Sequence, residues 1–125
     1  MRARRYKQEY RGQVIDLFTI GVLAKAIGRT PQAVLKQVMA GFVPETPFLK
    51  RRRDNAPLRL YTKGMIEAVR DVVTEIGMRS IRTDKRDKMH AAIVEKWRGQ
   101  GIEVGTPIDV VDPGTEADDP WQAAV

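Results

Sequence analysis

The sequence contains no cysteine and only one histidine, His90. Without cysteine the chain has no disulfide bonds, no thiol chemistry and no zinc site with sulfur ligands. A single imidazole is too few for a metal site of the usual kind, which recruits several nitrogen or sulfur donors. Asp87 stands at a ligand-like spacing from His90, but we interpret His90 as an exposed residue of a helix. We therefore expect no metal and no cofactor.

Long apolar segments and catalytic motifs are also missing. No run approaches the ~18 consecutive apolar residues that cross a membrane, and no apolar segment of signal-peptide type follows the basic N-terminal residues. The sequence has no phosphate-binding loop, no nucleophile elbow and no paired carboxylates in a glycine-framed loop. These absences favour a cytoplasmic protein that is not an enzyme and has no membrane partner.

Charge is abundant but uneven along the chain. There are 22 lysines and arginines against 16 acidic residues, and from Ile102 onward the chain has six acidic residues and no basic one. The first 101 residues therefore carry all 22 basic residues against ten acidic ones, a net charge of +12. So basic a small domain indicates a polyanionic partner such as DNA, RNA or a membrane surface; the alternative is a merely soluble basic surface.

Helix-start and helix-stop residues frame two short helices, expected over residues 20–27 and about 31–40. Each follows a threonine suited to cap its first turn and ends at a glycine: Thr19, Thr30, Gly28 and Gly41. Pro31 fits the first helical position, where its missing N–H costs no hydrogen bond. The pattern predicts two helices joined by a tight turn, an arrangement that often presents its second helix to DNA.

The next segment predicts a hairpin followed by two more helices. Short alternating runs, PFLK and LRLY, flank RRRDNAP, whose Asp54-Asn55 pair is a turn signal. After the N-cap Thr62, apolar residues recur with helical spacing up to Gly77. A fourth helix is expected over about residues 83–98, with an apolar stripe that includes Met89 and Trp97. This stripe serves packing or a dimer surface, and Tyr61 is expected in the core.

Together these elements predict a fold that is mainly α with a small β-hairpin: a winged helix-turn-helix plus a C-terminal helix and an acidic tail. Residues 1–17 are expected to form a basic N-terminal arm and residues 18–77 the winged helix-turn-helix domain. Residues 78–101 are expected to form the charged C-terminal helix. Residues 102–125 are expected to be an extended or disordered acidic tail.

Two segments, FTIGVLAKAIGRTPQAVLKQVMAGFVP and LRLYTKGMIEAV, resemble the N-terminal DNA-binding domain of MerR-type regulators and the related phage excisionase-like proteins. The matching positions are Thr19-Ile20-Gly21, Leu23-Ala24, Ala26-Ile27-Gly28, Thr30-Pro31, Gly41, Pro44, Arg59-Leu60-Tyr61 and Ile66. The resemblance covers about residues 18–77 and implies a phage-type DNA-binding module. The chain lacks the long dimerising helix and the cysteines or drug pocket of a MerR effector domain, so it does not imply a sensor.

Candidate DNA-binding residues come from the turn, the second helix and the hairpin. They are Arg29, Gln32, Lys36, Lys50, Arg51, Arg52, Arg53 and Arg59. Gln32 suits adenine and Lys36 suits guanine or phosphate in the major groove. Arg29 and the residues of the hairpin suit phosphate contacts, which position a protein without specifying sequence. The alternative for the hairpin residues is a solvated loop, and for Gln32 a solvated helix start.

Three functions remain open from the sequence. The first is a small transcriptional regulator or an excisionase-like architectural factor that binds double-stranded DNA in the nucleoid. The second is the DNA-recognition small subunit of a phage packaging terminase. The third is a protein–protein interaction module with a winged-helix fold, which the apolar Leu35 and Met39 favour. A homo-oligomer through the C-terminal helix and a protein partner for the acidic tail are further expectations.

Overall fold

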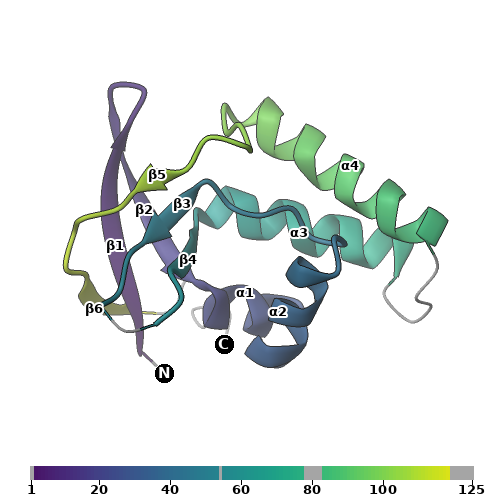
Figure 1. The fold of residues 1–125 in the computed structure, drawn as a ribbon, viewed down its shortest axis with the longest axis horizontal. Helices are drawn as coiled ribbons and strands as arrows, with labels where there is room; N and C mark the ends of the chain where they lie inside the picture. Colours follow the sequence, from purple (N-terminus) through teal and green to yellow (C-terminus); the bar gives the residue numbers. More distant parts are fainter. Residues whose placement is uncertain (1, 54, 78–82, 119–125) are drawn as a thin grey trace.

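The computed structural model describes residues 2–53, 55–77 and 83–118 and places six strands and four helices among them (Figure 1). The strands are β1 (Arg2–Tyr10), β2 (Gln13–Thr19), β3 (Phe48–Lys50), β4 (Leu58–Tyr61), β5 (Ile108–Asp109) and β6 (Thr115–Asp118). The helices are α1 (Ile20–Ala26), α2 (Pro31–Met39), α3 (Lys63–Ile76) and α4 (Thr83–Gly99). All six strands form one sheet in the order β5-β3-β4-β2-β1-β6.

The predicted basic N-terminal arm is instead a strand of this sheet. β1 and β2 form an antiparallel hairpin in which Tyr10 lies opposite Gln13. The two residues between them both have positive φ, 51° at Arg11 and 81° at Gly12, as a two-residue hairpin turn requires. Tyr6 and Leu17 lie opposite each other on one face and are both buried. The expectation of a separate arm over residues 1–17 is therefore wrong.

The acidic C-terminal segment supplies both edges of the sheet. β5 runs parallel to β3, and β6 runs antiparallel to β1 at the opposite edge. Ile102 and Val110 are buried, so the part of the segment that the structure describes belongs to the core. Residues 119–125 of the predicted tail lie outside the described part of the chain.

The predicted fold class is corrected by these strands. The chain is mixed α/β, with a six-stranded sheet curled into a half-barrel and four helices, not mainly α with a small hairpin. The hairpin that the sequence predicted is present as β3 and β4 but forms only the middle of that sheet. The winged helix-turn-helix is therefore not the architecture of this chain, although its helices occur in the predicted order.

The four predicted helices are confirmed, and their starts follow the predicted chemistry at two of three threonines. Thr30 Oγ1 accepts a hydrogen bond from the backbone N–H of Ala33 (3.1 Å), and Thr62 Oγ1 accepts one from Met65 (3.0 Å). Thr19 occupies the N-cap of α1 but makes no such side-chain bond. These caps satisfy N–H groups that the first turn of a helix leaves without partners.

The core lies between the sheet and the two longer helices, α3 and α4. Trp97, Met89 and Tyr61 are fully buried, as predicted for packing residues. The indole N–H of Trp97 donates to the backbone oxygen of Met65 (3.1 Å), which joins α4 to α3. The apolar stripe of α4 is thus covered within the chain itself.

In the described part of the chain, no helix has the length and apolar character needed to cross a membrane.

Candidate nucleic-acid interface

Helix α2 turns one face to the core and the other to solvent. Its residues Val34 and Val38 face the core and are buried. The residues on the opposite side are exposed and recur at positions i, i+3, i+4 and i+7: Gln32, Leu35, Lys36 and Met39. These four residues are called the exposed face of α2 below. Arg29 is exposed in the turn before α2, where its backbone N–H donates to Ala24 (2.9 Å).

The connection between β3 and β4 forms an arginine-rich loop, residues 51–57. Its first three residues, Arg51, Arg52 and Arg53, are exposed and are called the loop arginines below. Arg52 donates from Nε (3.0 Å) and Nη2 (2.8 Å) to the backbone oxygen of Ala56, so its own side chain braces the loop. The Arg51 Nε lies 3.8 Å from Asp109 Oδ1 on β5, with the Arg51 side chain 85% exposed. Residue 54 is outside the described chain.

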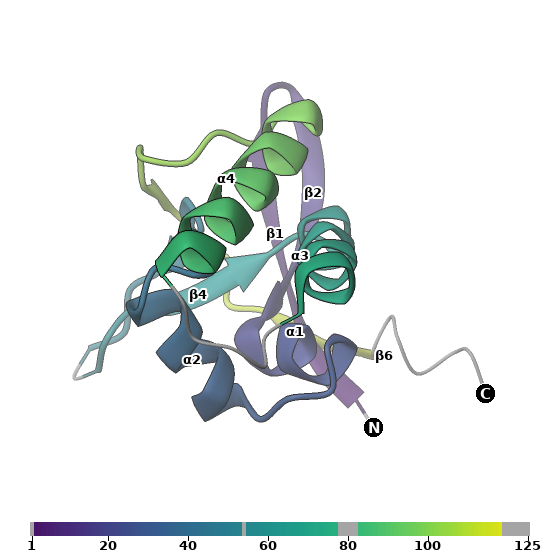
Figure 2. The ribbon, with the colours of Figure 1, turned by 90° about the vertical axis from the view of Figure 1, so that its right-hand side faces the viewer.

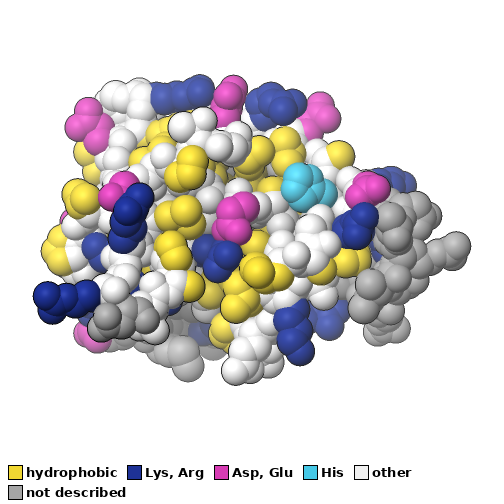
Figure 3. Space-filling view, in the orientation of Figure 1, with side chains coloured by type: hydrophobic (Ala, Val, Ile, Leu, Met, Phe, Trp, Pro, Cys, Tyr) yellow, Lys and Arg dark blue, Asp and Glu magenta, His cyan; other side chains and the backbone are white. Residues whose placement is uncertain are grey.

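The loop and α2 project from the same side of the molecule. In Figure 2 both lie on the side opposite α3 and β6, and Figure 1 places both in the lower half of the fold. The space-filling view of that side shows lysine and arginine side chains interspersed with apolar ones and a few carboxylates (Figure 3). The two elements that carry most of the predicted DNA-binding residues are therefore brought to one side of the protein.

Arg59 is held by a carboxylate that the sequence analysis did not single out. Its guanidinium donates to both oxygens of Glu45, at 2.5 Å (Nε to Oε1) and 3.1 Å (Nη2 to Oε2). The hydrogen bond that Arg59 donates to Glu45 raises the pKa of Arg59 above its ordinary value, and burial opposes the rise. The neighbouring Thr46 is buried and donates to Leu60 on β4 (2.6 Å), which fixes Glu45 beside that strand.

The same guanidinium links the hairpin to α2. Its Nη2 atom lies 3.9 Å from the sulfur of Met39, at the end of the helix. The Arg59 side chain is only 19% exposed. Arg59 therefore serves mainly to join β4, the Glu45 segment and α2, and its charge is largely neutralised within the chain.

Of the other predicted site residues, Lys50 is directed toward the protein and the rest are exposed to solvent. The Lys50 ammonium lies 5.9 Å from the centre of the Tyr6 ring, a cation–π distance, so Lys50 points toward the β1 strand. Arg29, Gln32, Lys36 and the loop arginines remain exposed.

Sequence reasoning missed Glu45 and Asp109, the two acids that face predicted site arginines. Glu45 stands five residues before the basic run that begins at Lys50, and neither acid carries a local signal of its pairing.

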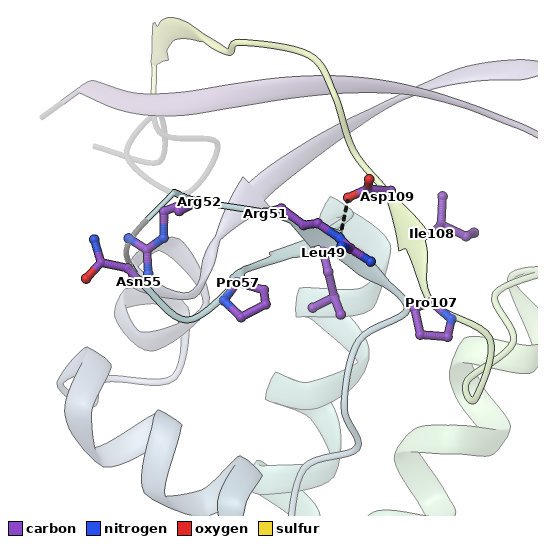
Figure 4. Close-up of a pocket in the computed structure, with 8 residues that line it drawn as sticks. All are labelled: Leu49, Arg51, Arg52, Asn55, Pro57, Pro107, Ile108 and Asp109. Carbon is purple, nitrogen blue, oxygen red and sulfur yellow. Dashed lines mark ion pairs between the residues drawn. The ribbon is translucent and has the colours of Figure 1, made fainter.

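A pocket of about 420 Å³ separates the loop from β5 (Figure 4). Its wall is apolar where Leu49, Pro57, Pro107 and Ile108 line it, and its rim carries Arg51, Arg52, Asn55 and Asp109. Figure 4 shows Arg51 and Asp109 directed toward each other across the pocket. This contact joins the arginine-rich loop to the acidic C-terminal segment.

His90 lies on α4 and is half-buried, not exposed as expected. Asp87, the residue with ligand-like spacing, accepts a hydrogen bond from Arg86 Nε (3.3 Å). Residues 2–53, 55–77 and 83–118 contain no group of three or more histidine, cysteine or acidic side chains that could hold a metal ion.

Comparisons of the chain with family models, curated proteins and solved structures gave no match. The resemblance to MerR-type and excisionase-like domains therefore stays a prediction from the residues quoted above.

Proposed function

We propose that this protein binds double-stranded DNA, with α2 in the major groove and the arginine-rich loop against the flanking phosphates. The observation that carries the proposal is that α2 and the arginine-rich loop lie on one side of the molecule (Figure 2), and that the residues of the exposed face of α2 and the loop arginines are exposed. A major groove about 12 Å wide admits one α-helix. Positive side chains beside such a helix commonly contact the sugar–phosphate backbone and fix its register.

The electrostatics of this side support a phosphate partner. The loop arginines, Arg29 and Lys36 are exposed. Guanidinium groups bind phosphate oxygens with paired, charge-assisted hydrogen bonds. Arg51 has one exposed carboxylate nearby, at 3.8 Å, and an exposed pair at that distance is worth only about 0–1 kcal/mol. A phosphate therefore competes readily with Asp109 for this side chain.

The test is a fluorescence-anisotropy titration of a labelled 20–30 base-pair duplex at several salt concentrations. If the three loop arginines and Arg29 each contact one phosphate, the logarithm of the binding constant should fall with the logarithm of the salt concentration with a slope of about −3.6, since each contact contributes roughly 0.9. A slope near zero, or no binding at 50 mM salt, contradicts the proposal. Replacing the loop arginines by alanine should weaken all duplexes about equally, because phosphate contacts carry no sequence information.

Two biological roles fit DNA binding: a regulator or excisionase-like factor, and a subunit of a packaging machine. A regulator or an excisionase-like factor selects a discrete site from random duplexes, whereas a packaging subunit assembles into rings. Selection from a random pool, combined with mass measurement of the free protein, separates these two roles.

The exposure of Leu35 (39%) and Met39 (73%) favours the second candidate, a protein-interaction module. Retention of a protein partner together with absence of DNA binding at 50–100 mM salt would select it.

A further inference from the structure

The exposed face of α2 combines one amide, one ammonium and two large apolar side chains. Leu35 is 39% exposed and Met39 is 73% exposed. Gln32 and Met39 are seven residues apart, which corresponds to about 10 Å along a helix rising 1.5 Å per residue. That length matches about three base-pair steps of 3.4 Å. The face therefore has the dimensions of a short reading surface, and half of its side chains are apolar.

The composition of this face restricts what it can read. It has no arginine to pair with the O6 and N7 atoms of guanine, and no carboxylate to accept from the N4 amino group of cytosine, so Lys36 is the one side chain of the face that suits guanine. Gln32 offers the two hydrogen bonds that suit adenine N6 and N7. The apolar group that the base edges present in the major groove is the C5 methyl of thymine. Leu35 and Met39 are suited to contact that methyl and would leave the polar edge of a G·C pair poorly solvated.

Neither apolar side chain belongs to the buried side of α2. Val34 and Val38 fill the buried side of α2, whereas Leu35 and Met39 point to solvent. Met39 also meets the Arg59 guanidinium, whose Nη2 atom lies 3.9 Å from its sulfur, so Met39→Ala gives up one long contact between α2 and β4. Substituting Leu35 or Met39 therefore changes the reading surface with little effect on the fold.

We infer that α2 selects A·T-rich sites through Leu35 and Met39, which bury thymine methyl groups, with Gln32 reading an adjacent adenine. This inference rests on the proposed DNA-binding function and specifies the class of sequence bound. Lys36 supplies affinity at the same face, either to a phosphate or to a guanine at the edge of the site.

Uracil-containing DNA tests the inference directly. A duplex is first selected from a random pool with the full protein. Each thymine is then replaced by deoxyuracil, which keeps base pairing and the O4 acceptor and removes only the methyl group. We expect affinity to fall about fourfold at each contacted thymine, the ratio that corresponds to about 0.8 kcal/mol for one buried methyl-sized group.

Matched variants assign the effect to the two side chains. The measured quantity at each position is the ratio of the affinities for the thymine and the uracil duplex, called the thymine-to-uracil ratio. In Leu35→Ala this ratio should fall close to one at one position, and in Met39→Ala it should fall close to one at a different position. Val14→Ala serves as the control, because Val14 is 66% exposed but lies on the β1–β2 hairpin. This variant should keep all the wild-type ratios.

The outcomes separate the inference from the proposed function. Salt-dependent DNA binding with thymine-to-uracil ratios near one at every position overturns the thymine inference and leaves DNA binding standing. A selected pool without A·T enrichment does the same. Absence of DNA binding at 50 mM salt overturns both. Loss of affinity in Val14→Ala as large as in Leu35→Ala also contradicts the assignment, because the effect would not be specific to α2.

Discussion

The molecule has two arginine- and lysine-rich hairpins, and their charges have different environments. On the β1–β2 hairpin, Lys7 Nζ pairs with Asp16 Oδ1 at 3.3 Å across the strands. Arg4 lies opposite Glu116 of β6 in the register of the sheet. In the β3–β4 hairpin the arginine-rich loop extends beyond the sheet, and the Asp109 carboxylate approaches Arg51 only to 3.8 Å.

This difference shows that the density of basic residues in a sequence does not measure the charge available to a partner. Strand residues lie opposite other strands, and cross-strand pairs of opposite charge stabilise a sheet. Here the acidic C-terminal segment supplies such partners to β1. A loop at the end of a hairpin has fewer neighbours, so the loop arginines keep most of their charge for a ligand.

The strongest test of this comparison removes charges from each hairpin in turn. Replacing the loop arginines by alanine should reduce the salt slope of DNA binding by about 2.7, since three phosphate contacts are lost. The variant Arg4→Ala/Lys7→Ala, whose two charges face Glu116 and Asp16 across the strands, should change the slope by less than one contact. Anisotropy titrations at several salt concentrations measure both slopes. Equal losses in the two variants would show that the hairpins contribute alike.

The second test concerns the buried residue next to Arg59. The hydroxyl of Tyr61 is buried and has no hydrogen-bond partner in the part of the chain that the structure describes. Burial raises the pKa of Tyr61 well above its ordinary value of 10, the Glu45 carboxylate adds to the rise, and the Arg59 guanidinium opposes it. Removing the hydroxyl in Tyr61→Phe should therefore increase the free energy of unfolding by about 1 kcal/mol.

The pH dependence of unfolding gives an independent measurement of the same residue. Because the folded chain holds the Tyr61 proton more tightly than the unfolded chain, the unfolded state binds fewer protons above about pH 10. The contribution of Tyr61 to the free energy of unfolding is fully present below pH 10 and decreases as the pH rises further. Urea titrations at pH 8 and pH 10.5 should show a larger loss in the wild type than in Tyr61→Phe. Parallel losses would exclude Tyr61 as the source.

A third test frees a charge that the fold neutralises. In Glu45→Gln the Arg59 guanidinium loses its anionic partner, and an additional positive charge faces α2. The salt slope should become steeper by about 0.9, the value of one further phosphate contact. Glu9→Gln on the β1–β2 hairpin removes an exposed carboxylate of equal charge and is the control. A slope that steepens equally in both variants reports net charge only.

The smallest effect is expected where the acidic segment meets the loop. Asp109→Asn removes an exposed ion pair worth about 0–1 kcal/mol, so DNA affinity at 100 mM salt should rise by about twofold. Asp112→Asn is unsuitable as a control, because Asp112 accepts from the backbone N–H of Lys7 and of Gly114. Glu103→Gln, on an exposed residue of the same segment, is suitable. Weaker binding in Asp109→Asn would mean that Asp109 orients Arg51 for its ligand.

The helices and the β3–β4 hairpin could be predicted because their signals are local. Thr30 and Thr62 stand at the starts of helical patterns, and apolar residues of α3 and α4 recur with the helical period. The exposed face of α2 could be inferred from the same period. Locating the loop arginines required only the alternation of residues on both sides of the Asp54-Asn55 signal.

The remaining strands depend on partners far away in the sequence. β5 and β6 have two and four residues, too few to show a periodicity, and β6 pairs with a strand more than one hundred residues earlier. In β1 the face that carries Tyr6 and Tyr10 also carries Arg4, so no alternation of apolar and polar residues is visible in the sequence. The dipeptide Arg11-Gly12 was the one local sign of a hairpin. Likewise, the pairing of Arg59 with Glu45 depends on tertiary packing.

The C-terminal segment passes over the sheet between its two edges, and Gly114 makes this close passage possible. A Cβ atom at Gly114 would lie 2.5 Å from the Tyr6 ring, and its φ is +84°. During synthesis β1 emerges first and its outer neighbour β6 more than one hundred residues later. At the usual 5–20 residues per second, the nascent chain keeps an unfinished sheet for about 6–20 s. Over this interval the outer edge of β1 has no strand beside it, and an unpaired strand edge is a template for pairing with other chains.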